Sequence, residues 1–595
     1  MAWFVELSVK YSDLLADWLT ELGYTHCFFL AGGNIMHLLE SCSRKFKCIP
    51  VVHEVAAGIA VEYFNEVAGG PRAFALVTAG PGLTNIVTAM AGAYMESHEL
   101  LVIGGQVKTS DLARGMVRQR GIQEVDGVDI ARPVTVASRL MDQVVSQQTF
   151  AEWSQAGSSG RKGPVFIEIP LDVQAAPVER ETLDSKQPFV APNVFRPVAS
   201  ETLAQIAMMV REAKRPVLLL GGGLSRKTTA DVSSRLAELG VPVMTTWNGA
   251  DRIGSDHPCY FGRPNTWGQR SANILVQQAD LLVALGTRLG LQQSGFNWQE
   301  FIPVGKVVQV DCDERELTKG HPRVDLPVCA DANVVLRSLV AADLGTHSEW
   351  VEFCRSVRAA IPLVEPVNHT GEGYLSPYVF VDTLSRLATS DDVVIPCSSG
   401  GAFTVSNQTF SQKRGQIFFT DKSLASMGYG LSAAMGAAIA TDGRRTVLIE
   451  GDGGFTQNLQ ELGTVRAQKL NLKIFIFDDH GYASIRMTQR SYFGGRYVGC
   501  DIETGLGIPN WEPLFAAYDI PVMRIGPGFE SDPEFLQRFN AVGARAFIVR
   551  IDPEQTYFPK ITSRVTASGG MESNPLHRMT PDLDEATAAK VFRYL

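Results

Sequence analysis

The sequence contains no run of about 18 apolar residues, the length that a membrane-spanning helix needs. Between Met1 and Asp13 it also lacks the basic segment and apolar core that mark a secretory signal. Basic residues do not outnumber acidic ones, because the formal net charge is −9 at pH 7. We therefore expect a cytoplasmic protein that binds neither membranes nor nucleic acid.

Cysteine is sparse, and its spacing is uninformative. The chain has nine cysteines, and no two of them show the C-x-x-C spacing of a zinc or redox site. Scattered cysteines of this kind indicate reduced, mostly buried thiols rather than disulfides. The hydrophobic content of 45% and charged content of 20% are instead typical of a globular protein with strands and helices.

The chain of 595 residues is too long for one hydrophobic core, and at ~150 residues per domain it predicts three or four domains. Apolar strands alternate with helix-like stretches, which predicts an α/β fold of doubly wound domains with mainly parallel sheets. We expect domains over residues 1–180, 195–345 and 370–560, and a polar tail over 561–595. The second domain should have strands near residues 217, 241, 281 and 307, and the tail a short helix over residues 584–594. No internal repeat is evident, so a fold shared by the first and third domains would not show in the sequence.

The most informative element is a Gly-Asp-Gly turn around Asp452, directly after a short apolar strand. Backbone N–H groups in such a turn can approach phosphate oxygens, and a carboxylate offers a hard oxygen ligand for Mg²⁺. The turn by itself also fits an ordinary loop. A second strand further on ends in Asp478 and Asp479, which favours a site formed by two neighbouring strand ends.

These two elements resemble those of the thiamine-diphosphate (ThDP) enzymes, in which a Gly-Asp-Gly turn and a later Asn-Asn pair hold Mg²⁺ and the cofactor diphosphate. The resemblance implies that Asp452, Asp479 and the Gly481 carbonyl bind the metal. Asp478 and Asp479 stand where Asn-Asn is usual, so the extra negative charge should strengthen metal dependence or be compensated nearby. Diphosphate contacts are expected from Gly451, Gly453, Gly454 and Tyr482.

The same resemblance assigns pyrimidine binding to the first domain and diphosphate binding to the third. Glu54 follows an apolar strand and opens a helix of small residues, as the family's catalytic glutamate does. Apolar surroundings favour a protonated carboxyl group, which suits a group that exchanges a proton with a ring nitrogen. The alternative is a glutamate that only interacts with the helix dipole.

Further motifs match the family in chain order. Gln123 is expected near the reacting carbon, and Met427 is the apolar residue expected to support the bent cofactor and therefore to act in catalysis. Ala425 would offer its backbone carbonyl to the cofactor's amino group. Other expected cofactor contacts are Gly80, Pro81, Asn85, Ser399, Gly400 and Gly401, with Ser398 next to them.

The central domain of this family often holds FAD that takes no part in redox chemistry. Gly222, Gly286, Arg288 and Asp311 follow three predicted strands and match the positions that line the flavin. A doubly wound sheet places such strand ends in one crevice, so we expect bound FAD. An empty, vestigial domain is the alternative, since the G-x-G-x-x-G fingerprint is absent.

The order and spacing of these motifs are most similar to those of the acetolactate-synthase-like branch of the family. Ile122 replaces the usual Phe, and the Trp expected near position 488 or 489 is missing. The runs 262–268 and 574–577 look closer to the flavin-containing acetyl transferase of branched-sugar (yersiniose A) biosynthesis and to cyclohexane-1,2-dione hydrolase.

We therefore predict a homo-oligomeric ThDP- and Mg²⁺-dependent carboligase. It would decarboxylate pyruvate, a 2-keto acid donor, and transfer the two-carbon unit to a ketone acceptor such as a nucleotide-linked ketosugar. The alternatives are acetolactate synthase, with pyruvate as acceptor, a C–C hydrolase or lyase acting on a dione, and a non-catalytic scaffold.

Overall fold

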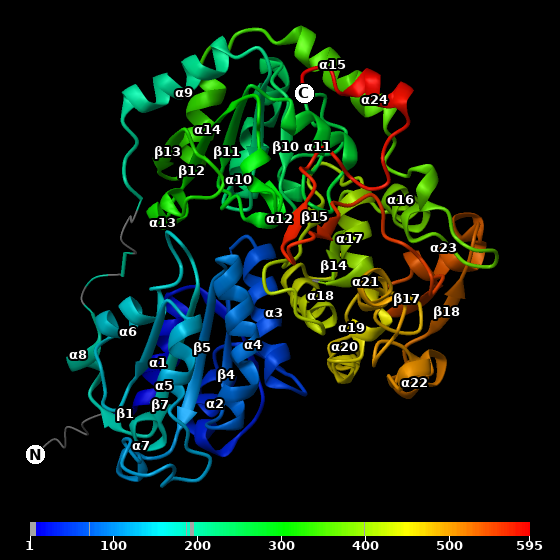
Figure 1. The fold of residues 1–595 in the computed structure, drawn as a ribbon. Helices are drawn as coiled ribbons and strands as arrows, with labels where there is room; N and C mark the ends of the chain where they lie inside the picture. The colour runs from blue at the N-terminus through cyan, green and yellow to red at the C-terminus, as the bar shows by residue number, and fades with distance from the viewer. Residues whose placement is uncertain (1–7, 71, 186, 188, 191–194, 398) are drawn as a thin grey trace, which may run out of the picture.

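The computed structural model describes residues 8–70, 72–185, 187, 189–190, 195–397 and 399–595. In this part of the chain, three parallel sheets are packed among helices, coloured blue, green and yellow to orange from the N-terminus to the C-terminus (Figure 1). The α/β fold class predicted from the alternating pattern is confirmed. No helix of the described residues is long and apolar enough to cross a membrane.

The first and third sheets have the same strand order. The first runs β3-β2-β4-β5-β7-β6 and the third runs β15-β14-β16-β17-β19-β18, and all neighbours are parallel. The shared fold that the sequence could not reveal is therefore present. The strands are β2 (Tyr24–Phe29), β3 (Lys47–Pro50), β4 (Arg72–Val77), β5 (Leu100–Gln106), β6 (Ala137–Leu140), β7 (Pro164–Pro170), β14 (Val393–Pro396), β15 (Ile417–Phe418), β16 (Thr446–Gly451), β17 (Leu472–Asp478), β18 (Val522–Ile525) and β19 (Arg545–Arg550).

The central sheet has five strands in the order β10-β9-β11-β12-β13, also parallel. The strand order reverses between β9 and β11, because β10 pairs with the outer edge of β9 while β11 to β13 follow on its other side. The four strands expected here, near residues 217, 241, 281 and 307, are all present. Their bounds are β9 (Pro216–Leu220), β10 (Val243–Thr245), β11 (Leu281–Leu285), β12 (Lys306–Asp311) and β13 (Leu326–Cys329).

The first and third domains share one hydrophobic core. Helix α3 (Glu54–Val67) packs against α18 (Tyr429–Ala440), shown side by side in Figure 1. A Cβ at Gly436 would lie 2.1 Å from the Ala60 carbonyl oxygen, so only glycine permits this approach. Small residues thus let the two helices approach closely.

The C-terminal stretch folds back onto the central domain. After the hairpin β20 (Ser563–Val565) and β21 (Met571–Ser573), Leu576 and Met579 enter a core cluster with α15 (Ser348–Ala360). Helix α24 (Glu585–Val591) confirms the short helix expected in the tail and packs on α15. The tail is therefore integral to the central domain.

Truncating a buried tail residue should destabilise the central domain. Leu576 is 1% exposed, so we expect Leu576→Ala to lower the free energy of unfolding by about 2–5 kcal/mol through lost burial and a residual cavity. Urea unfolding followed by tryptophan fluorescence measures this. Val565→Ala is the control, because Val565 is 59% exposed. Equal, small effects of both changes would show that the tail adds nothing to the core.

Candidate active site

The two turns predicted to bind the metal, around Asp452 and Asp479, together form the metal element. They lie where two neighbouring strands of the third sheet end. Strand β16 ends at Gly451, which pairs in register with Phe477 near the end of β17. Asp452 follows at once and begins the short helix α19 (Asp452–Phe455). Parallel pairing thus places the turn after β16 beside the turn after β17, as the sequence predicts.

Asp452 is completely buried and held by backbone donors. Its Oδ1 accepts from the Gly453 N–H at 2.6 Å, and its Oδ2 accepts from the N–H groups of Asp479 at 3.2 Å and Gly481 at 3.0 Å. Burial raises the pKa of Asp452 well above its usual range, and the neighbouring Asp479 and Asp478 raise it further. A cation bound here would offset this cost.

Asp479 is buried and paired with an arginine. Arg486, on helix α21 (Ala483–Phe493), donates from Nη2 to Oδ1 and to the backbone carbonyl of Asp479, both at 2.7 Å. Burial raises the pKa of Asp479 to about 7, while Arg486 acts to lower it. Arg486 supplies the nearby compensation expected for this position.

The protein residues fit a site that a ligand completes. Mg²⁺ prefers six oxygen ligands, and the described residues contain no group of three or more His, Cys, Asp or Glu side chains placed to bind a metal. Two buried donors close to the carboxylates, Arg486 Nε and the Tyr557 hydroxyl, have no acceptor in the described part of the chain. A Cβ on Gly451 would meet open space. Diphosphate oxygens would satisfy such donors and complete the metal's coordination.

The remaining expected diphosphate contacts surround this pair of strand ends. Ser399 precedes helix α17 (Gly400–Thr409), which begins near the carboxyl end of β14, next to β16. Gly401 abuts Tyr557, and a Cβ there would lie 2.2 Å from the tyrosine ring. Ser398 lies outside the described residues. Two more of the expected contact residues pack against neighbours within the metal element. Gly453 lies against the Tyr482 ring, and Gly454 lies against Glu450.

The segment that enters α18 lies next to the metal element. Asn458, which follows α19, donates to the Gly428 carbonyl at 2.7 Å. Met427 is 39% exposed, and Ala425 has φ of 53°. Left-handed backbone at a residue with a side chain is strained and clusters at functional sites. It also occurs at His480, with φ of 65°.

In the first domain, Glu54 is the first residue of α3 and is buried. Its Oε2 accepts from Asn85 Nδ2 at 2.9 Å, so two predicted residues are brought together. Asn85 lies on helix α4 (Pro81–Glu96), whose first residue is the predicted contact Pro81. Among the hydrogen bonds of the described residues, none joins Glu54 to Asp452 or Met427.

Gly80 and Gln123 also meet. A Cβ at Gly80 would lie 2.4 Å from the Gln123 carbonyl oxygen, and both residues have positive φ, 63° and 64°. Gln123 is exposed in the single chain, and its neighbour Ile122 is 86% exposed. The loop after β5 therefore presents Ile122 and Gln123 at the surface.

In the central domain, the glycines expected to line a flavin contact each other or nearby backbone. Gly286 follows β11 and lies against Gly223, while a Cβ at Gly222 would meet Asn248. Close packing of the two turns thus explains these glycines without a ligand. Arg288 reaches the third domain, where it donates to the Ser423 hydroxyl at 2.7 Å.

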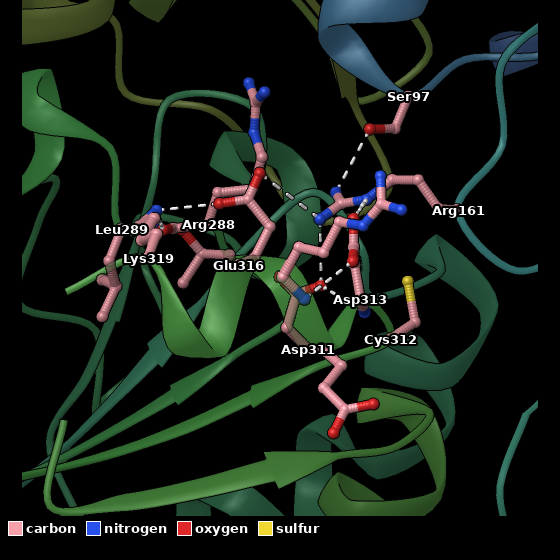
Figure 2. Close-up of polar contacts among 12 residues, drawn as sticks. Ser97, Arg161, Arg288, Leu289, Asp311, Cys312, Asp313, Glu316 and Lys319 are labelled. Atoms are coloured by element: carbon pink, nitrogen blue, oxygen red, sulfur yellow. Dashed lines mark hydrogen bonds and ion pairs between the residues drawn. The ribbon is translucent and has the colours of Figure 1, made fainter. Parts of the chain in front are cut away.

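Asp311 lies in a charged cluster at the carboxyl end of β12. Figure 2 shows Arg161 of the first domain reaching this cluster, with Arg161 Nη2 3.1 Å from Asp311 Oδ1 and Arg161 Nε 3.4 Å from Asp313 Oδ2. Nη2 also lies 3.7 Å from Glu316. An adjacent cavity of about 390 Å³ is lined by Arg161, Phe195, Arg196, Cys312, Asp313, Glu314, Arg315, Cys329 and Ala330.

Sequence reasoning missed Arg486, Tyr557, Arg161 and Glu96, the last of which accepts from the Lys422 N–H at 2.7 Å. Arg486 had a usable signal, because a basic residue follows the acidic pair within the first turn of the next helix. The other three are far along the chain from the elements that they contact, and no local pattern marks them. The run 262–268 is largely buried packing, with Arg263 fully enclosed and hydrogen-bonded to Gln412 and the Phe410 carbonyl.

Comparison with known proteins agrees with these three domains. Residues 9–130 match the thiamine pyrophosphate enzyme N-terminal TPP binding domain, 203–339 its central domain and 399–549 its C-terminal TPP binding domain. The acetolactate synthase isozyme 1 large subunit of Escherichia coli (strain K12) is 29% identical over 556 residues, covering 92% of this chain and 95% of that protein. An acetolactate synthase of Mycobacterium bovis is 30% identical over 504 residues, covering 82% and 78%.

A third relative, acetolactate synthase 1, chloroplastic, of Zea mays, is 30% identical over 543 residues, covering 87% of this chain and 81% of that protein. These names give no support to the expected link with yersiniose biosynthesis or cyclohexane-1,2-dione hydrolysis, and they favour the acetolactate alternative. With all three domains matched and relatives covering most of its length, the chain belongs to the thiamine-diphosphate-dependent enzyme family, in its acetolactate-synthase-like part.

Proposed function

We propose that the protein is an acetolactate synthase, which decarboxylates pyruvate and joins the two-carbon unit to a second 2-keto acid. The observation that carries the proposal is the buried pair of Asp452 and Asp479 at adjoining strand ends, together with the Glu54–Asn85 pair of the first domain. The names of the relatives support pyruvate as acceptor over a nucleotide-linked ketosugar or a cyclic dione.

When bound, ThDP supplies the electron sink that lets CO₂ leave a 2-keto acid. Glu54 would hold and release a proton from a buried position, with Oε2 fixed by Asn85 Nδ2. Asp452, Asp479 and the Gly481 carbonyl would bind Mg²⁺ through oxygen. Gln123 and Met427, both exposed in the single chain, would border the substrate.

We further propose that the active unit is a homodimer with each site shared between two subunits. Glu54 makes no hydrogen bond to the metal element of its own chain among the described residues. Large apolar side chains are exposed beside both halves of the site, with Met116 73% and Ile122 86% exposed in the first domain and Phe493 62% exposed in the third. Such patches indicate a contact surface.

FAD in the central domain, without a redox role, is the remaining cofactor proposal. The cavity of about 390 Å³ at the carboxyl ends of β12 and β13 is in the size range of small-ligand sites, and Arg161 and Arg196 are among the residues that line it. Asp311 and Arg288 would border the same ligand. The flavin absorbance of the purified protein tests this proposal.

The central test is the product formed from pyruvate. We expect the purified protein with ThDP and Mg²⁺ to release CO₂ and form acetolactate from pyruvate alone, as measured by mass spectrometry. CO₂ release that needs an added ketone, with a two-carbon gain on that ketone, would replace this function with ketone-directed transfer. Absence of CO₂ under both conditions would reject pyruvate as donor.

Glu54→Gln should lower turnover by about 10²–10⁴-fold, because the amide cannot exchange the proton. Thermal stability should change little, since the amide keeps the shape of the side chain. Steady-state CO₂ release measures the effect, and Glu40→Gln on the surface helix α2 (Met36–Ser43) is the control. Turnover within a few-fold of the unmodified protein would remove Glu54 from the mechanism.

Asp452→Ala should abolish ThDP binding in the presence of Mg²⁺, as measured by calorimetric titration.

Mixing two inactive variants tests whether each site is shared between subunits. An inactive Glu54→Gln subunit paired with an inactive Asp452→Ala subunit regains one site with both residues intact. After dissociation and random reassociation we expect about a quarter of the original sites to be active. If both residues of a site belonged to one chain, mixing would restore no activity.

A further inference from the structure

Two arginines accompany the acidic pair that replaces Asn-Asn. Asp479 is paired with Arg486 at 2.7 Å, and Asp478 is paired with Arg524 at 2.9 Å. Asp478 also accepts from Trp511 Nε1 at 3.2 Å. Each added carboxylate thus has a guanidinium partner, which Asp478 shares with Glu512.

At the metal ligands, the pairing keeps the charge equal to that of a site with an uncharged residue at position 479. Asp479 and Arg486 form a neutral pair, so only Asp452 contributes a net negative charge among the two carboxylate ligands. Asp452 with an asparagine at position 479 would carry the same charge. A diphosphate is repelled by excess negative charge, so this balance lets a metal-bound diphosphate approach.

Arg486 also restricts the position of the metal ligand. The Arg486 side chain is 3% exposed and that of Asp479 is 6% exposed, so the pair is shielded from water. Nη2 donates both to Oδ1 and to the backbone oxygen of Asp479, which fixes the carboxylate. Removing one partner of a buried ion pair leaves the other charge unpaired, which is costly.

We propose that Arg486 is a positioning residue that makes Asp479 act as an uncharged ligand acts in related sites, so that the cofactor diphosphate binds beside two aspartates. The proposal rests on the proposed function, because it concerns ThDP and Mg²⁺ binding. It assigns a role to the charge of Arg486 and not only to its bulk.

The test is a double-mutant cycle read out by ThDP affinity at saturating Mg²⁺, measured by calorimetric titration. We expect Arg486→Met to weaken ThDP binding about tenfold or more, because the Asp479 charge is then unopposed. Adding Asp479→Asn to Arg486→Met should recover the part of that loss that comes from the unopposed Asp479 charge. Arg490→Met is the control, since Arg490 lies on the same helix with its exposed Glu554 pair.

Folding and function are separated within the same experiment. The double variant removes both charges of the buried Arg486–Asp479 pair, so it should fold and melt close to the unmodified protein. ThDP binding by Arg486→Met equal to that of the Arg490→Met control would overturn the inference. So would a double variant that binds as weakly as Arg486→Met alone. Failure of the unmodified protein to bind ThDP would instead reject the proposed function on which the inference rests.

Discussion

The burial of carboxylates at the carboxyl edge of the third sheet is the constraint on which the rest of the site depends. Asp452 is fully enclosed, and its oxygens accept from the N–H groups of Gly453, Asp479 and Gly481. Those amides converge only because β16 and β17 are adjacent and parallel. The left-handed His480 and the turn at Gly481 follow from the need to direct the amides at one carboxylate.

A second constraint joins the domains around the segment that carries Met427. Glu96, at the end of α4, accepts from the Lys422 N–H at 2.7 Å and from Asn248 of the central domain at 2.7 Å. The pKa of Glu96 is lowered to about 2, since hydrogen bonds and nearby cations outweigh the opposing effect of its burial. Arg288 fixes Ser423 in the same segment. The central domain therefore helps to shape the candidate active site without containing it.

Local patterns predicted much of the fold because parallel strands buried on both faces are nearly continuous apolar runs. The strands around 217, 281 and 447 were placed correctly for this reason. The glycines after β9 and β11 were a weaker guide. Their contacts are with Gly223 and Asn248, and close packing of two turns needs glycine just as a ligand does, so the flavin site stays a prediction.

The sequence by itself determined the predicted chemistry of the site, because each motif is local in the chain. These motifs are a Gly-Asp-Gly turn, an acidic pair after the next strand, and a glutamate that opens a helix of small residues. Only the tertiary structure decided which charges oppose one another. Arg524 lies 46 residues beyond Asp478, and Arg161 lies 150 residues before Asp311. Such pairs follow from strand order and domain packing, because a buried charge is stabilised by whichever partner the fold brings near, not by its neighbours in the chain.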